Sequence, residues 1–126
     1  MIYGHVYGIV YNEKIVYVGV TTDPIKRRFS RHKSDAKNND DSIVHRNMRE
    51  KGIDNFTIKP IRILPKCLLR FAEMIYIVKY KTLYPLGLNT NFGGYGADAE
   101  DDILGFMRDA MEVISQDADI FNKIMK

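Results

Sequence analysis

Residues 3–20 read YGHVYGIVYNEKIVYVGV. Over residues 3–11, β-branched and aromatic side chains alternate with small ones, and residues 15–20 resume this pattern after the polar residues 12–14. Alternation of this kind predicts strands, and the polar interruption predicts a turn between them. We therefore expect two antiparallel strands joined as a hairpin.

The register of this hairpin decides which side chains meet. If the turn is centred near Glu13, Tyr7 pairs with Gly19 and Tyr17 pairs with Ile9. Tyr7 and Tyr17 are then diagonal neighbours on one face of the sheet, within reach of each other. A slip of one residue moves them to opposite faces, so contact between the two tyrosines depends on this register.

Two helices are expected after the hairpin. The first begins with Asp23, which can cap free backbone N–H groups, and Pro24, which suits the first helical position, and it extends to about Ser34. The second extends from residue 41 or 42 to residue 51. It ends at Gly52, because glycine favours the left-handed conformation of a C-terminal cap.

The rest of the chain predicts one more strand and two more helices. Phe56–Leu64 has the composition of a strand, in which Pro60 indicates a sheet edge or a bulge. Residues 66–82 are apolar on nearly every side, as in a buried helix. An Asn- and Gly-rich loop over residues 89–96 follows. Residues 98–126 then combine an acidic first turn with an apolar stripe at helical spacing, which predicts an amphipathic helix packed on the same domain.

Charge is unevenly distributed along the chain. The 126 residues carry a formal net charge of +3. Residues 1–97 contain 16 basic and 8 acidic side chains, a charge of +8, whereas residues 98–126 contain 3 and 8, a charge of −5. Such a division indicates that the basic part binds an anion.

Composition excludes several classes of protein. The chain has one cysteine, Cys67, so it can form neither an internal disulfide nor a thiolate metal site. No stretch is long and apolar enough for a membrane span, and no signal peptide is visible. We expect an intracellular protein of the cytoplasm or nucleus (or nucleoid), with no membrane partner.

The first expected helix carries a basic cluster. Arg28 and His32 lie four residues apart with Arg31 beside them, so one face presents two guanidiniums and an imidazole. This arrangement suits a phosphodiester, because a guanidinium can bind two phosphate oxygens at once. The alternative interpretation is a solvated basic face.

Glu73 lies within the apolar residues 71–77, where a carboxylate needs a partner because desolvating its charge is costly. The partner is either a basic side chain, such as Arg70 three residues earlier, or a metal ion. Asp and Glu do not cluster elsewhere in residues 1–97. A catalytic metal would therefore be held by one carboxylate and waters, which suits Mg²⁺.

The tyrosines and two histidines give weaker signals. Tyrosines in strands are usually packing residues. A catalytic tyrosine would need its pKa, about 10 when unperturbed, lowered by nearby cations or a metal-bound water. His5 and His45 have no ligand partners at metal-site spacing, and we interpret both as structural or surface residues.

Six short motifs follow one another over residues 3–94. They are Val6-Tyr7-Gly8-Ile9 with Tyr17-Val18-Gly19, Thr21-Thr22-Asp23-Pro24, Arg28-Phe29-Ser30-Arg31-His32, Gly52-Ile53-Asp54-Asn55-Phe56, Glu73-Met74-Ile75-Tyr76-Ile77 and Leu88-Asn89-Thr90-Asn91-Phe92-Gly93-Gly94. Each motif is weak alone, but in this order they resemble the motifs of the GIY-YIG nuclease superfamily.

The resemblance implies a fold and an activity. The fold is an α+β domain, a three-stranded antiparallel sheet flanked by helices, which we place over residues 1–97. The helical extension expected over residues 98–126 lies outside the motifs. The activity is that of a metal-dependent DNA endonuclease, which hydrolyses phosphodiester bonds with one Mg²⁺ or Mn²⁺ ion per site.

The resemblance also assigns catalytic roles by position. Tyr7 and Tyr17 are the motif tyrosines, and one of them, Tyr7 in preference, helps to activate the attacking water. Arg28 holds the scissile phosphate and stabilises charge that develops in the transition state. Glu73 binds the divalent metal ion, which polarises the phosphate and stabilises the leaving oxygen.

Supporting roles fall to other residues. His32 and Asn89 are expected to support the site through proton handling or by positioning neighbours. DNA contacts are expected from the remaining basic residues of the first helix, Lys26, Arg27, Arg31 and Lys33. The acidic residues 98–126 either pack away from the DNA or form a homodimer contact.

Three positions depart from the family pattern. His5-Val6-Tyr7 stands in place of the usual Gly-Ile-Tyr, and Asp40 stands where some members have a histidine. Arg27 and Arg28 are adjacent, and the spacing to His32 selects Arg28. Because none of these departures removes an essential group, we expect an active enzyme. The alternative is a DNA-binding module that keeps the fold and does not cleave.

Overall fold

The computed structural model describes residues 2–91 and, beyond them, the four single positions 108, 111, 115 and 119. The expected domain boundary at residue 97 lies outside the described residues. So do the amphipathic helix and the dimer contact expected within residues 98–126, apart from those four positions.

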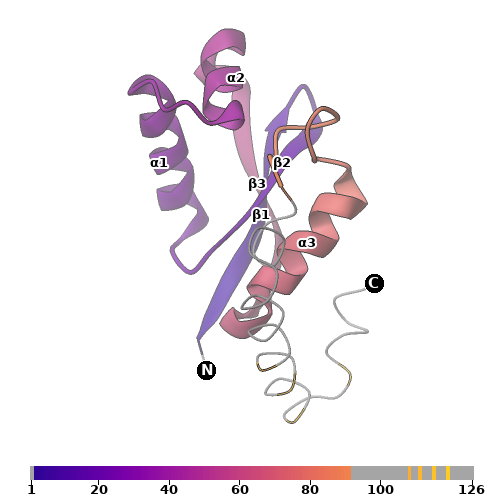
Figure 1. The fold of residues 1–126 in the computed structure, drawn as a ribbon. Helices are drawn as coiled ribbons and strands as arrows, with labels where there is room; N and C mark the ends of the chain where they lie inside the picture. The colour runs from indigo at the N-terminus through magenta and orange to yellow at the C-terminus, as the bar shows by residue number, and fades with distance from the viewer. Residues whose placement is uncertain (1, 92–107, 109–110, 112–114, 116–118, 120–126) are drawn as a thin grey trace.

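Three antiparallel strands form one sheet, in the order β2-β1-β3. They are β1 (Tyr3–Tyr11), β2 (Lys14–Thr21) and β3 (Phe56–Pro65). The helices α1 (Ile25–Lys37) and α2 (Ile43–Lys51) lie on one side of this sheet and α3 (Leu69–Tyr80) on the other (Figure 1). The predicted α+β fold is therefore confirmed. No helix of the described residues has the length and apolar character needed to cross a membrane.

The hairpin has the predicted register, reached through a bulge. Asn12 and Glu13 both have positive φ angles, 52° and 67°, as the tightest hairpin turns require. This turn pairs Tyr11 with Lys14 and Val10 with Ile15, which is one residue out of the predicted register. A bulge next to Ile9 then shifts the pairing by one residue and restores the predicted register. Tyr7 consequently lies opposite Gly19, and Ile9 lies opposite Tyr17, as expected.

Pro60 lies on an edge strand and next to a bulge, the two positions that the sequence predicts for it. β3 pairs only with β1, so it is an edge strand among the described strands. Its pairing shifts between Arg62 and Pro60, which marks a bulge. A proline is tolerated at such positions because it has no N–H to donate to the ladder.

Buried side chains form two clusters, one on each face of the sheet. The cluster beneath α3 contains Val6, Val18, Leu64, Leu68, Leu69, Ala72, Tyr76 and Ile77. The cluster beneath α1 and α2 contains Tyr7, Ile9, Ala36, Val44, Met48 and Phe56. Successive residues of β1 thus point to opposite faces, and the face that Tyr7 and Tyr17 share is the one covered by α1 and α2.

The helices lie where the sequence predicts them, but some of their ends differ. α1 extends to Lys37 instead of about Ser34, and α3 ends at Tyr80 instead of residue 82. Two of the starts differ as well. The predicted start of α1 is wrong in both parts. Pro24, expected at the first helical position, is the N-cap, and neither Asp23 nor any other side chain caps this helix. Asp23 instead forms an ion pair with Arg31 (3.5 Å). The expected helix of residues 66–82 begins with a short 3-10 turn, η2 (Lys66–Leu68), before α3. Gly52 ends α2 at a φ of 91°, as expected.

Candidate functional site

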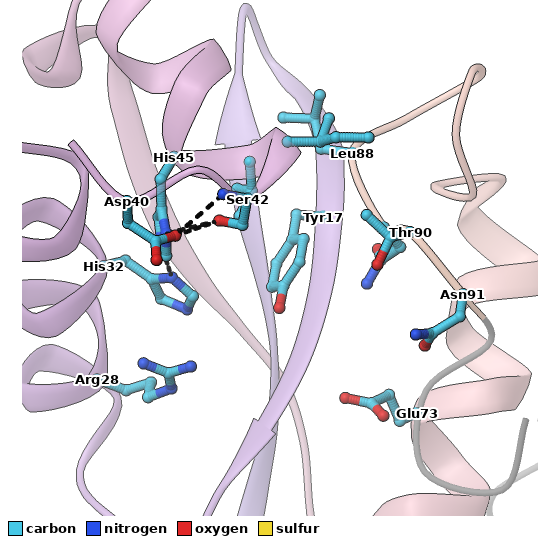
Figure 2. Close-up of a pocket in the computed structure, with 13 residues that line it drawn as sticks. Tyr17, Arg28, His32, Asp40, Ser42, His45, Glu73, Leu88, Thr90 and Asn91 are labelled. Atoms are coloured by element: carbon cyan, nitrogen blue, oxygen red, sulfur yellow. Dashed lines mark hydrogen bonds and ion pairs between the residues drawn. The ribbon is translucent and has the colours of Figure 1, made fainter. Parts of the chain in front are cut away.

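A pocket of about 330 Å³ opens at the β2 edge of the sheet (Figure 2). It is lined by Tyr17, Arg28, His32, Asp40, Ser42, Ile43, Val44, His45, Glu73, Leu88, Asn89, Thr90 and Asn91. These residues come from both sides of the sheet, since α1 and α2 lie on one face and α3 on the other. The pocket therefore gathers side chains that are far apart in the sequence.

Five of the six expected catalytic residues line this pocket, and Tyr7 does not. In Figure 2, Arg28 and Glu73 point toward each other from opposite walls, with the Tyr17 hydroxyl between them. Arg28 is half-buried, whereas its neighbour Arg27 is exposed and lies outside the lining. A guanidinium and a carboxylate that face one cavity suit a phosphate and a cation, respectively.

Tyr7 is only 1% exposed and lies behind the pocket wall. Its hydroxyl oxygen is 2.8 Å from His32 Nε2. The rings of Tyr7 and Tyr17 both lie edge-on to the His32 ring, at centroid distances of 5.8 and 5.5 Å. The predicted proximity of the two tyrosines thus takes the form of a shared contact with His32.

Gly19 has a steric reason to be glycine. It lies directly across the strand pair from Tyr7, whose ring crosses over it. A Cβ at position 19 would collide with the Tyr7 hydroxyl and ring. The absence of a side chain at Gly19 therefore allows Tyr7 to reach His32.

Both tyrosines are held in the protonated form. Burial raises the pKa of Tyr7 and of Tyr17 above the ordinary value of 10, and the negative charge of Glu73 raises both further. The positive charge of Arg28 acts in the opposite direction on both pKa values, but it is outweighed. A tyrosine of this site can thus accept a proton only while it passes its own proton to another base.

A chain of polar contacts leads from Tyr7 to the surface. His32 Nδ1 is 2.8 Å from His45 Nε2, and His45 Nδ1 is 2.5 Å from Asp40 Oδ2. The Ser42 hydroxyl is 2.6 Å from the same carboxylate oxygen and 2.7 Å from His45 Nδ1. Both histidines are buried and Asp40 is exposed, so the contacts connect a buried hydroxyl with solvent.

Charges differ along this chain. Burial and the positive charge of Arg28, followed by His45 and Arg31, lower the pKa of His32 to about 3, so the imidazole is neutral near pH 7. Hydrogen bonds from His45 and Ser42 hold the pKa of Asp40 well below its usual range. The chain thus ends at the surface in a carboxylate, and His32, which contacts the buried Tyr7 hydroxyl, is a neutral imidazole.

Sequence reasoning misses this chain of contacts. It interprets His45 as a structural or surface residue, but His45 is buried and lies within hydrogen-bond distance of His32, so the surface alternative is wrong. It considers Asp40 only as a replacement for a histidine. His32 and His45 are on different helices, and their contact depends on how α1 packs against α2, for which the sequence contains no spacing signal.

Asn89 has a structural position. Its side chain accepts a hydrogen bond from the Val18 N–H and donates one to the Val18 carbonyl, both at 2.9 Å. The Leu88 N–H also donates to the Val16 carbonyl, at 2.8 Å. These bonds attach the loop over residues 81–91 to the edge of β2 and so form one wall of the pocket.

The remaining basic residues of α1 lie outside the pocket lining. Lys26, Arg27 and Arg31 are exposed, and Arg31 forms the ion pair with Asp23. Lys33 lies over the Phe29 ring, 4.9 Å from its centroid. The structure thus separates Arg28 and His32, which line the pocket, from the other cations of the same helix, Lys37 included.

The pocket has few metal-binding groups. No three His, Cys, Asp or Glu residues among those described are grouped so that they could hold a metal ion. Glu73 is the carboxylate on the α3 side, and Thr90 and Asn91 lie with it along the same wall (Figure 2). One carboxylate with neighbouring oxygen ligands fits Mg²⁺, which keeps several waters, but it does not fit a closed all-protein site.

Comparison with known proteins finds similarity to a viral protein. Over 87 residues, or 66% of the chain, the sequence is 37% identical to a protein of Invertebrate iridescent virus 6 whose name describes it as a putative MSV199 domain-containing protein (146R). The matched segment covers 36% of that viral protein, so the chain spans about a third of its relative's length. No protein-family model matches the chain, and no solved structure is significantly similar to it.

Proposed function

We propose that this protein is a metal-dependent DNA endonuclease that hydrolyses phosphodiester bonds. The observation that carries the proposal is the pocket in which the Arg28 guanidinium faces the Glu73 carboxylate across the Tyr17 hydroxyl. A phosphate needs a positive donor, and a divalent cation needs a carboxylate, and this pocket offers one on each side. The GIY-YIG resemblance supports the same function with the same residues.

Each residue has a task in this proposal. Arg28 binds the scissile phosphate and stabilises the negative charge that grows on its oxygens. Glu73 binds the divalent ion, Mg²⁺ or Mn²⁺, and that ion, when bound, supplies positive charge for the phosphate and the leaving oxygen. Tyr17 lines the pocket and orients the bound phosphate or water.

Tyr7 is the residue proposed to accept the proton of the attacking water. Its hydroxyl has a base partner, His32 Nε2 at 2.8 Å. Tyr7 can therefore take a proton from water while it gives its own proton to His32, and no free tyrosinate is needed.

Plasmid nicking tests the proposed function. The full chain with Mg²⁺ or Mn²⁺ should convert supercoiled plasmid to the nicked form, and EDTA should stop the reaction. Glu73→Gln should abolish nicking because it removes the carboxylate that binds the ion. Glu50→Gln, at an exposed position on α2, is the matched control and should nick as fast as the wild type. A wild type that fails to nick DNA with either divalent ion would refute the nuclease function, and a DNA-binding measurement on the same protein would then test the alternative of a non-cleaving DNA-binding module.

Two adjacent arginines provide a second test. Arg28→Ala should lower the maximal nicking rate by about 10²- to 10³-fold, as removal of a transition-state donor does. Arg27→Ala removes an exposed guanidinium one residue away. It should weaken DNA binding slightly and leave the maximal rate unchanged. An equal decrease of rate in the two variants would contradict a specific role for Arg28.

A further inference from the structure

Proton handling at this site poses an electrostatic problem. In the proposed reaction, His32 receives the proton of Tyr7 and becomes positive. Yet His32 is buried, and the positive charges of Arg28 and Arg31 oppose a further charge on it. A histidine in these surroundings is a poor final acceptor, so the proton needs another destination.

The contacts behind His32 offer one. Asp40 is the anionic end of the chain of contacts, and a carboxylate can only accept hydrogen bonds. His45 must therefore carry its proton on Nδ1, 2.5 Å from Asp40 Oδ2. If His45 is neutral, its Nε2 is an acceptor, and His32 must then be protonated on Nδ1. His32 Nε2 is left as the acceptor that faces the Tyr7 hydroxyl.

We propose that Asp40 and His45 are positioning residues that hold His32 as the Nδ1–H tautomer and accept the proton it releases. This inference rests on the proposed nuclease function. As Tyr7 takes a proton from water, its own proton moves to His32 Nε2, and the His32 Nδ1 proton moves to His45 Nε2. His32 ends neutral and His45 ends as an imidazolium that faces the Asp40 carboxylate.

The same hydrogen-bond contacts can form before and after the proton transfer. Before transfer, Tyr7 donates to His32 and His32 donates to His45; after transfer, the direction of both bonds is reversed. The bond between His45 Nδ1 and Asp40 is unchanged throughout. The positive charge therefore moves away from Arg28 and toward a carboxylate at the protein surface, which is electrostatically favourable.

Tautomer measurement by ¹⁵N NMR of the histidine rings tests the positioning directly. The chain has three histidines, so assignment is simple, and His5 lies outside the contacts and serves as an internal reference. His32 should be protonated on Nδ1 and bare on Nε2 in the wild type without DNA. Finding the His32 proton on Nε2 would overturn the proposal.

Kinetics with two variants test the proton acceptor. Asp40→Asn keeps the shape but removes the negative charge, and His45→Gln can accept from His32 without binding a proton. Each should lower the maximal nicking rate by roughly ten- to hundredfold with an unchanged KM for DNA. Asp41→Asn, at the next exposed position, should nick like the wild type. Asp40 is exposed, so its variant should fold even if His45→Gln does not.

The outcomes separate this inference from the proposed function. If Asp40→Asn and Asp41→Asn nick equally fast, Asp40 has no role and the proposal fails while the nuclease function stands. If the wild type does not nick DNA, the nuclease function fails. The tautomer of His32 still decides in that case whether Asp40 and His45 position it.

Discussion

The two tyrosines of the hairpin occupy the same face of the sheet in different environments. Tyr17 lines the pocket, whereas Tyr7 is buried with its hydroxyl against His32. If Tyr7 is the proton acceptor, Tyr7→Phe should lower the maximal nicking rate by about 10²- to 10⁴-fold, the usual contribution of general acid–base catalysis.

Tyr17→Phe is the matched comparison for this prediction. It removes one hydroxyl from the pocket and keeps the ring contact with His32. Its effect on the maximal rate should be smaller than that of Tyr7→Phe. The reverse order, measured by single-turnover nicking, would transfer the role of proton acceptor to Tyr17.

The neutral state of His32 makes stability depend on pH. Its pKa is lowered to about 3 in the folded protein, against about 6.5 when unfolded. Above pH 6.5 both states are neutral, and below it only the unfolded chain gains a proton. The free energy of unfolding should therefore decrease from about pH 6.5 toward pH 3, with a slope from this residue of up to about 1.4 kcal/mol per pH unit.

Urea unfolding at a series of pH values measures this slope. His32→Gln removes the titrating group, so its free energy of unfolding should change less between pH 6.5 and 4 than that of the wild type. His5→Gln is the control, because His5 lies outside both the pocket and its hydrogen bonds, and its pH slope should match the wild type. An unchanged slope in His32→Gln would mean that His32 is not buried in the neutral form.

At the scale of elements, Asn89 takes the place of a neighbouring strand along the outer edge of β2. Its side chain makes two hydrogen bonds with Val18 from a position that is 6% exposed. Asn89→Ala leaves the Val18 N–H and carbonyl without these partners, and it should lower the free energy of unfolding by about 1–3 kcal/mol.

Hydrogen exchange locates this effect. The Val18 amide should exchange faster in Asn89→Ala than in the wild type, because it no longer has its acceptor. Thr90→Ala, at the exposed next position, is the control and should leave both stability and Val18 exchange unchanged. Protection of Val18 that survives in Asn89→Ala would show that the loop remains attached through other bonds, such as that from Leu88 to Val16.

Local sequence patterns predict the helices and strands well, but they do not predict features that depend on how these elements pack against one another. The alternation over residues 3–20 and the cap at Gly52 depend on neighbouring residues, and both predictions are correct. The bulge beside Ile9 produces the expected register, but no residue type at this position predicts a bulge. The Asp23 cap is wrong because the carboxylate pairs with Arg31 instead. The role of His45 depends on contact between two helices, which a single sequence does not encode as a spacing.

At the scale of the molecule, charge distribution and pocket position are separate features. Residues 1–97 carry a charge of +8, yet the pocket lining contains one arginine, Arg28, and no lysine. Most of the positive charge therefore lies outside the pocket. In the proposed nuclease, these outer cations attract DNA without regard to sequence, and the pocket residues act on one phosphate.

Salt dependence of DNA binding tests this division in the full chain. The logarithm of the binding constant for a labelled duplex should fall linearly with the logarithm of salt concentration, because binding to phosphates releases counterions. Neutralising two exposed cations of α1 in the double variant Lys26→Gln with Arg27→Gln should reduce the slope by roughly two, about one for each phosphate that is no longer neutralised. Fluorescence anisotropy over a range of salt concentrations measures both slopes.

The matched control lies on the opposite edge of the sheet. Lys59 is exposed on β3, whereas the pocket lies at the β2 edge. Lys59→Gln changes the net charge by one without removing a cation from α1, so its salt slope should equal that of the wild type. If Lys59→Gln reduces the salt slope by as much per removed charge as the α1 variant does, then DNA binding depends only on the net charge of the protein. The basic residues of α1 would then not form the DNA-binding surface.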